Sequence, residues 1–184
     1  FGASPDSPIA LMRWHAKTEE QLRDSKISWT FIRPHLYMQN LLRFGDQVKN
    51  ENMFTAPMGS DKFSLVDIRD VAEVAAKILA GNGHADKIYT LTGPNANSYE
   101  EIATQLSSIL RKTVNYDKVS QGKFYDQLVA QGTPTWRAYD LANISNAYVN
   151  GDKKLVTKDI NQLLGRPARD IETFLEDYKQ VFLK

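Results

Sequence analysis

Cysteine is absent from this 184-residue chain, and histidine occurs only three times. The lack of cysteine excludes disulfide bonds, thiolate metal ligands, iron–sulfur clusters and a cysteine nucleophile. Long hydrophobic runs are also lacking, and the first ten residues hold no basic segment, so we predict neither a transmembrane helix nor a secretory signal. The formal net charge of +1 gives no bulk attraction to nucleic acid or to an anionic membrane. We therefore expect a soluble, cytoplasmic protein that binds neither.

Several motifs of nucleotide and hydrolytic chemistry are missing as well. The sequence has no Gly-x-x-x-x-Gly-Lys phosphate loop, no Gly-x-Ser-x-Gly nucleophile elbow and no His-Glu-x-x-His zinc motif. Gly81 and Gly83 match two glycines of a dinucleotide fingerprint, but Asp86 stands at the third position. This segment also follows a predicted helix instead of a strand. We interpret it as the turn that ends a helix, and we expect no bound catalytic metal.

The hydrophobic pattern predicts helices and strands that alternate along the chain. Helical spacing of apolar residues is found over residues 9–24, 36–44, 67–81, 98–110, 157–164 and 171–182. Short runs with β-branched and aromatic residues predict strands at 28–33, 62–66, 87–92 and 114–119. From residue 123 onward the pattern is helical, with breaks at 132–134 and 150–152. The alternation indicates an α/β domain with partly parallel strands.

Polar residues predict where several helices begin. The expected caps are residues 6–8, Asp67 or Asp70, Ser98 and Thr157. The Ser98 hydroxyl accepts a backbone N–H while Glu101 reaches back, which is a capping box. Arg69 lies between the two aspartates and can pair with one of them.

His15 and Glu19 are the first candidates for chemistry. They are four residues apart on a predicted helix, about one turn, so both project from the same face. A histidine can transfer protons near neutral pH, and a carboxylate beside it fixes the ring and raises its pKa. The alternative is a surface pair with no catalytic role.

The segment after the strand at 28–33 is the second candidate site. Ligands bind at the carboxyl ends of strands in open α/β sheets, and this segment begins at Pro34. Tyr37 and Asn40 are three residues apart and share a face if a helix begins here. The alternative is that Pro34 only ends the strand and that Asn40 caps a helix or faces solvent.

Several segments together resemble the NmrA-like branch of the atypical short-chain dehydrogenases. The resemblance is carried, in this order, by residues 14–34, 37–40, 66–72, 89–94, 98–103 and 164–167. It covers essentially the whole chain. Lys26 departs from it, because the family commonly has glycine at this turn.

The resemblance implies the C-terminal part of a Rossmann-like doubly wound sheet with a mainly helical substrate lobe, binding NADP or NAD. In this interpretation Pro34, Tyr37 and Asn40 pass near the nicotinamide. His15 and Glu19 stand where ordinary short-chain dehydrogenases have a Tyr-x-x-x-Lys pair. That difference favours hydride delivery to a quinone or related small-molecule acceptor, with His15 as the acid, over the usual carbonyl chemistry.

The family's glycine-rich phosphate loop does not occur in this sequence. The resemblance therefore implies that residues 1–184 are a single partial domain whose dinucleotide-binding N-terminal half is absent. We expect the isolated chain to be inactive and to bind no NAD(P), and to associate with itself or with such a half.

Two functions stay open for the complete protein. One is an NAD(P)H-dependent oxidoreductase that reduces quinones, and the other is a dinucleotide-sensing regulatory module without catalysis. A third possibility is a stable piece with no activity of its own. The aromatic residues Tyr125, Trp136 and Tyr139 are candidates for the substrate pocket, with core packing as the alternative use.

Overall fold

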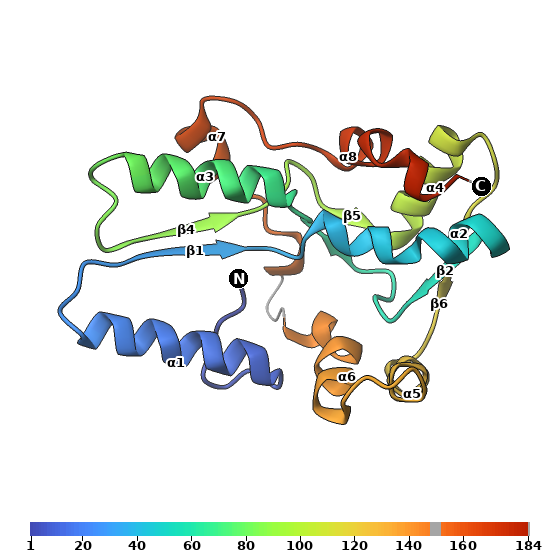
Figure 1. Cartoon of the computed structure of the whole chain (residues 1–184), viewed down its shortest axis with the longest axis horizontal. Helices are drawn as coiled ribbons and strands as arrows, with labels where there is room; N and C mark the ends of the chain where they lie inside the picture. Colours follow the sequence, from blue (N-terminus) through green and yellow to red (C-terminus); the bar gives the residue numbers. More distant parts are fainter. Residues whose placement is uncertain (148–151, 184) are drawn as a thin grey trace.

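Helices and strands alternate in the computed structural model, which describes residues 1–147 and 152–183 (Figure 1). The helices are α1 (Ala10–Asp24), α2 (Gly45–Glu51), α3 (Ile68–Ala80), α4 (Tyr99–Leu110), α5 (Gln121–Ala130), α6 (Thr135–Ala142), α7 (Asp159–Leu164) and α8 (Ile171–Asp177). The strands are β1 (Thr30–Pro34), β2 (Met53–Ala56), β3 (Lys62–Phe63), β4 (Lys87–Leu91), β5 (Asn97–Ser98) and β6 (Asn115–Lys118). Short 3₁₀ helices are η1 (Met38–Phe44), η2 (Ile144–Ala147), η3 (Asp152–Lys154) and η4 (Lys179–Val181). The predicted α/β class is confirmed.

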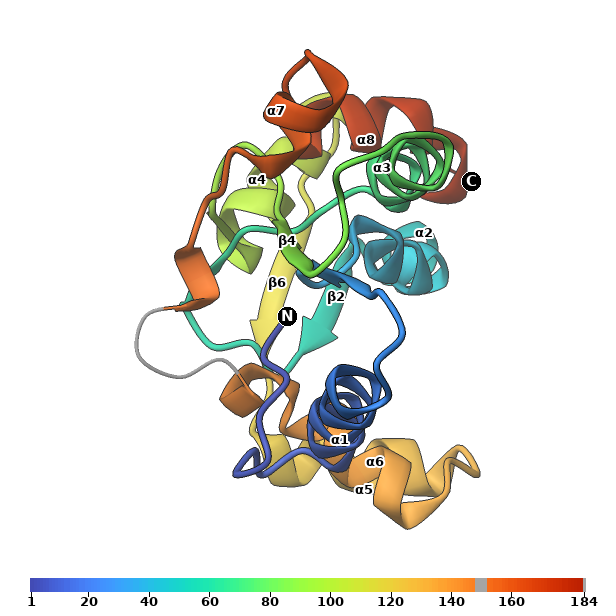
Figure 2. The same cartoon turned by 90° about the vertical axis from the view of Figure 1, so that its left-hand side faces the viewer.

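The strands form three pairs. β1 pairs in parallel with β4, β2 pairs in parallel with β6, and β3 pairs antiparallel with β5. Figures 1 and 2 show α1 and α3 on opposite sides of the β1–β4 pair. The predicted mixture of parallel strands and covering helices is therefore confirmed.

Three chain segments meet where β1 ends. The His35 N–H donates to the carbonyl of Leu91, and the Val66 N–H donates to the carbonyl of Leu36 at 2.9 Å. The Met38 N–H then donates to the carbonyl of Val66, also at 2.9 Å. Gly93 is required beside this crossing, because a Cβ there would overlap the carbonyl oxygen of Leu65. The backbone thus fixes the path of the chain from β1 into η1.

Buried apolar side chains form two clusters. The larger one joins η1, β2, α4 and α8, and its fully buried aromatic side chains are Phe54, Phe63, Phe174 and Phe182. The smaller one joins α3, β4 and α7 through Val66, Val74, Leu91 and Ile160. Burying one such phenylalanine stabilises a fold by about 1.5–3 kcal/mol, so the larger cluster is the main core.

The predicted caps of α3 and α4 are confirmed. The carboxylate of Asp67 accepts the N–H of Arg69 at 2.9 Å, and Arg69 also pairs with this aspartate. Ser98 and Glu101 form the capping box at the start of α4. Both caps use partners within three residues, so sequence spacing is sufficient to find them.

Two predicted caps are wrong. Residues 6–8 do not cap α1; its first N–H groups, on Ala10 and Leu11, donate to the buried carboxylate of Asp140 at 3.1 Å. Thr157 does not cap α7, because its hydroxyl donates to the carbonyl of Thr90 on β4. In both cases a partner far along the chain replaces the local one.

Several predicted boundaries also differ from the structure. The helix expected at 36–44 is the 3₁₀ helix η1, followed by α2, because seven residues are too few to separate a period of three from one of about 3.6. Strand β2 was not predicted, the strand expected at 62–66 ends at residue 63, and the final helix ends at residue 177 before η4. The break at 132–134 is confirmed. Residues 150 and 151 of the other break lie outside the described residues.

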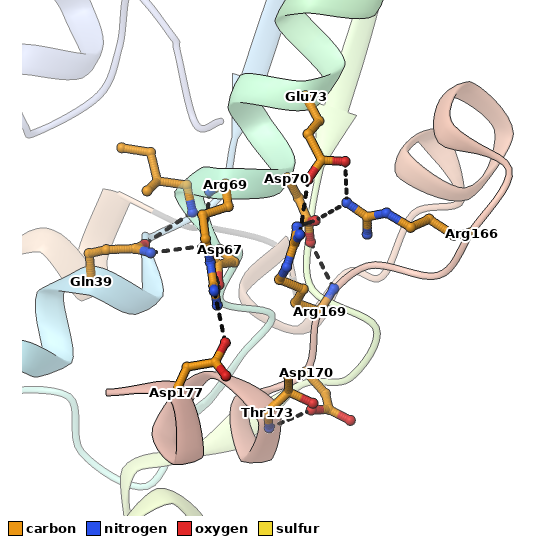
Figure 3. Close-up of polar contacts among 11 residues, drawn as sticks. Gln39, Asp67, Arg69, Asp70, Glu73, Arg166, Arg169, Asp170, Thr173 and Asp177 are labelled. Atoms are coloured by element: carbon orange, nitrogen blue, oxygen red, sulfur yellow. Dashed lines mark hydrogen bonds and ion pairs between the residues drawn. The ribbon is translucent and has the colours of Figure 1, made fainter. Parts of the chain in front are cut away.

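A cluster of charged residues holds the C-terminal segment against α3 (Figure 3). The fully buried carboxylate of Asp70 accepts hydrogen bonds from Arg166 at 2.8 Å, from the backbone N–H of Arg169 at 2.7 Å and from the Arg169 guanidinium. The half-exposed Glu73 accepts from the same two arginines. Beside them, Arg69 joins the Asp67 cap to Asp177 on α8 at 2.8 Å.

The buried carboxylate of Asp70 should be the main contributor within this cluster. Asp70→Asn removes the charge while keeping the shape, and it leaves Arg166 and Arg169 without their buried partner. We expect the free energy of unfolding, measured by urea denaturation at pH 7, to fall by about 2–3 kcal/mol. Glu73→Gln, the control in the same cluster, should cost less than about 1 kcal/mol because exposed ion pairs contribute little. Equal losses in the two variants would contradict the central role of Asp70.

Candidate functional site

A cavity of about 640 Å³ lies beside the carboxyl end of β1. Helix α1 forms one wall, and β1 with the following segment through η1 forms another. Residues 56–58, Phe1, Ala3 and side chains from α3, α4, α5, α6 and η2 complete the lining, which is mostly apolar and aromatic. Apolar cavities of about 300–1,000 Å³ with a few polar groups are typical small-molecule sites.

The cavity brings together five of the residues predicted from sequence. Its lining includes His15, Glu19, Pro34, Tyr37 and Asn40. His15 and Glu19 come from α1, Pro34 ends β1, and Tyr37 and Asn40 lie in the segment that follows it. The crossing of the chain at the end of β1 therefore joins them.

The three aromatic residues predicted for a substrate pocket do not line this cavity. Trp136 and Tyr139 on α6 are 56% and 49% exposed, and the Trp136 ring lies 5.8 Å from that of Trp14. Tyr125 is partly buried on α5, and its neighbour Phe124 lines the cavity instead. Their pocket role stays a prediction.

Glu19 is bound to arginines and not to His15. Its buried carboxylate accepts from Arg23 at 2.9 Å and from Nε of Arg33 at 2.8 Å. Burial raises the pKa of Glu19, but the hydrogen bonds and charges of Arg33 and Arg23 outweigh this and hold that pKa below its ordinary value of 4.5. Glu19 is therefore ionised at neutral pH and cannot act there as a proton donor.

The two histidines of the cavity differ in environment. His15 is exposed, and within the described residues its side chain makes no hydrogen bond or ion pair. His35 is buried, and its Nδ1 accepts the N–H of Leu36 at 2.8 Å. Burial lowers the pKa of His35 to about 4, so this ring is neutral at physiological pH.

The 3₁₀ conformation of η1 aligns polar side chains along the cavity. A 3₁₀ helix has about three residues per turn, so side chains three positions apart eclipse. Tyr37, Asn40 and Arg43 follow this spacing, and all three line the cavity. Within the part of the chain that the structure describes, their side chains make no hydrogen bond or ion pair with protein groups. Burial raises the pKa of Tyr37 above its ordinary value.

Sequence reasoning missed Arg43 and Tyr99 in the lining. Arg43 lies three residues after Asn40, as Asn40 does after Tyr37. The sequence does not indicate that all three side chains share a face, because it does not show that this helix is a 3₁₀ helix with three residues per turn. Tyr99 follows the predicted capping serine, and its position at the start of a helix resembles that of an ordinary core residue. No local pattern indicates that either side chain reaches a cavity beside β1.

The described residues lack two kinds of feature, a metal-ion cluster and a membrane-spanning helix. Over residues 1–147 and 152–183, no group of three or more His, Cys, Asp or Glu side chains is placed to hold a metal ion. No helix within these same ranges is long and apolar enough to cross a membrane.

Sequence comparison finds one matching family and relatives that are named oxidoreductases. The profile described as "NmrA-like family" matches residues 9–178. The NAD(P)H azoreductase of Xenophilus azovorans is 33% identical over 183 residues, which cover 99% of this chain and 64% of that protein. Quinone oxidoreductase 2 of Escherichia coli is 29% identical over 162 residues, covering 88% and 57%. The chain thus spans less than two thirds of the length of these relatives.

Solved structures show the same fold. The NADPH-dependent quinone oxidoreductase of Escherichia coli, complexed with NADPH, superposes with a TM-score of 0.85 at 27% identity, covering 95% of this chain and 62% of that one. The Citrobacter sp. triphenylmethane reductase complexed with NADP(H) gives 0.80 at 28% identity, covering 96% and 61%. Nmra, a negative transcriptional regulator in complex with NAD, gives 0.56 at 17% identity, covering 88% and 56%, and shares the fold alone. The Rossmann-like α/β class expected from sequence is therefore confirmed.

The ion pairs of Glu19 should make stability depend on pH. The folded-state pKa of Glu19 lies below its ordinary value of 4.5, so its contribution is present above that pH and is lost as the pH falls through the folded value. Glu19→Gln should lower the free energy of unfolding at pH 7 by about 2 kcal/mol. The gap from the unmodified protein should narrow as the pH is lowered below 4.5, as urea denaturation at several pH values would show.

Glu20→Gln is the matched control, because Glu20 is exposed and makes no ion pair within the described residues. It should change the stability little at any pH. A Glu19→Gln gap that stays constant from pH 7 to pH 3 would contradict the assignment.

Proposed function

The chain belongs to the NmrA-like family, and from this premise we propose that it forms the acceptor-binding part of an NAD(P)H-dependent oxidoreductase that reduces quinones or related small molecules. The observation that carries the proposal is the cavity beside β1, which gathers His15, Glu19, Tyr37 and Asn40 from separate elements. The names of its relatives, an azoreductase and a quinone oxidoreductase, support this class of reaction.

The residues present fit the nicotinamide end of NADP or NAD. Tyr37 and Asn40 offer a hydroxyl and an amide that lack protein partners within the described residues, and both groups suit a carboxamide. The NADPH and NADP(H) complexes of two structural relatives support the same cofactor class. The sequence holds no glycine-rich phosphate loop, so no residue of this chain is assigned to the pyrophosphate.

The bound dinucleotide would supply a hydride to the acceptor. A quinone that gains a hydride needs one further proton to become a hydroquinone, and we assign its donation to His15, which lines the cavity and is exposed. Glu19 is assigned a positioning role: its ionised carboxylate binds Arg33 and holds that side chain in the cavity wall.

The regulatory alternative has weaker support. An azoreductase and a quinone oxidoreductase are 33% and 29% identical to this chain, whereas the transcriptional regulator shares 17% identity and the fold alone. An enzyme is therefore the preferred interpretation.

The domain organisation and partners stay predictions. Pairing with a further segment or with a second copy is supported by apolar side chains at the surface, among them Ile27 at 65% and Leu79 at 86% exposure. The small-molecule acceptor is the partner that the cavity supports. Cytoplasmic location also stays a prediction.

Replacing His15 tests the function directly. NADPH oxidation is followed at 340 nm with 1,4-naphthoquinone, using the protein in the longest form that its reading frame encodes. His15→Ala should lower kcat at least about tenfold, because a general acid contributes roughly 10²–10⁴-fold and water replaces part of it. The KM for NADPH should change little, since His15 is not assigned to the dinucleotide.

Lys17→Ala is the control on the same helix, because Lys17 is exposed and does not line the cavity. It should retain the full kcat. An equal loss of kcat in both variants would show that His15 is not the proton donor. Tight binding of the dinucleotide without turnover of any quinone would contradict the enzyme and favour the regulatory module.

A further inference from the structure

The charges that line the cavity are not balanced. Three ionised side chains line it: Glu19, Arg33 and Arg43. The carboxylate of Glu19 neutralises Arg33, and it also binds Arg23 from outside the lining. Arg43 has no carboxylate partner within the described residues. One positive charge of the cavity is therefore available to a ligand.

Arg43 is distinct among the arginines in this respect. Most arginines of the chain pair with aspartate or glutamate, and this holds for Arg23, Arg33, Arg69, Arg166 and Arg169. Those without such a partner in the described ranges are Arg13, Arg43, Arg111 and Arg137. Of these four, Arg43 alone lines the cavity.

A largely buried tyrosine lines the same cavity as this charge. Tyr99 is only 5% exposed, its ring lies against Phe44 at 6.4 Å and Phe54 at 6.3 Å, and it lines the same cavity. No protein group within the described residues bonds to its hydroxyl. Burial and the neighbouring Tyr116 raise the pKa of Tyr99, and the Arg43 charge opposes that rise. Both Arg43 and Tyr99 line the cavity. A guanidinium and a hydroxyl donor together suit an oxyanion.

The remaining lining suits a flat aromatic body. Tyr37 and Asn40 precede Arg43 on the eclipsed face of η1, and Phe44 adds an aromatic surface beside it. An aromatic ring can pack against such side chains while a charged substituent reaches the guanidinium. The face Tyr37–Asn40–Arg43 thus runs from the proposed nicotinamide end to a cationic end.

We propose that Arg43, together with Tyr99 of the same cavity lining, binds an anionic substituent of the acceptor, so that the site selects aromatic quinones bearing a sulfonate, carboxylate or phosphate group. The inference rests on the proposed function and names its substrate class. The unpaired Arg43 charge disfavours cationic acceptors for the same reason.

Two quinones that differ by one charged group test this selection. They are 1,4-naphthoquinone-2-sulfonate and 1,4-naphthoquinone. The measured quantity is the kcat/KM for the sulfonate divided by the kcat/KM for the neutral quinone. Arg43→Gln should lower this ratio about tenfold, the loss expected for one partly exposed charge-assisted contact. Arg43→Lys should restore part of it, and added salt should weaken the preference of the unmodified protein.

Arg111→Gln is the matched control, because Arg111 is exposed, makes no ion pair in the described residues and lies outside the lining. It changes the net charge equally and should leave the ratio as in the unmodified protein. The inference would be overturned if Arg43→Gln left the ratio of the two kcat/KM values unchanged. It would also be overturned if this variant raised the KM for NADPH without lowering that ratio.

Binding separates this inference from the function on which it rests. Calorimetric titration with the sulfonate requires no turnover, and Arg43→Gln should raise its Kd about tenfold. Absence of turnover for both quinones would contradict the oxidoreductase while leaving this measurement valid. Equal Kd values for the sulfonate in the two proteins would overturn the anionic subsite alone.

Discussion

The crossing of three backbone segments at the end of β1 is the constraint on which the site depends. Hydrogen bonds tie residues 35–38 to Val66 and Leu91, and Gly93 permits the close approach to Leu65. The chain that leaves β1 must therefore run beside Val66 before it enters η1. Without this path, residues 37–43 would not face α1 across a cavity.

Charge pairing decides what the cavity can do chemically. The sequence predicts that Glu19 fixes the ring of His15 and raises the pKa of that histidine, but the carboxylate binds Arg23 and Arg33 instead and stays ionised. Glu19 neutralises the charge of Arg33 in a largely apolar cavity, where an unpaired guanidinium would destabilise the fold. Arg43 has no such partner in the described ranges, so the cavity combines a neutralised wall with a cationic end.

Local features of the fold could be predicted from the sequence, and contacts distant in the chain could not. The capping box of Ser98 and Glu101 needs only three residues and was found. The cap of α1 by Asp140 spans 130 residues and was missed. The site follows the same rule. The sequence indicated His15, Glu19 and the positions near the end of β1. It could not indicate Arg43, whose place depends on the 3₁₀ period, or the arginine partners of Glu19, one of which lies on β1.

The proposed function places the acceptor in the space between α1 and η1. A crystal structure of the protein with NADP and 1,4-naphthoquinone-2-sulfonate would locate the bound quinone. We expect the quinone ring in this cavity, with His15 near a quinone oxygen and the sulfonate within hydrogen-bonding distance of Arg43. A quinone bound elsewhere on the protein, with the cavity filled only by water, would contradict this placement.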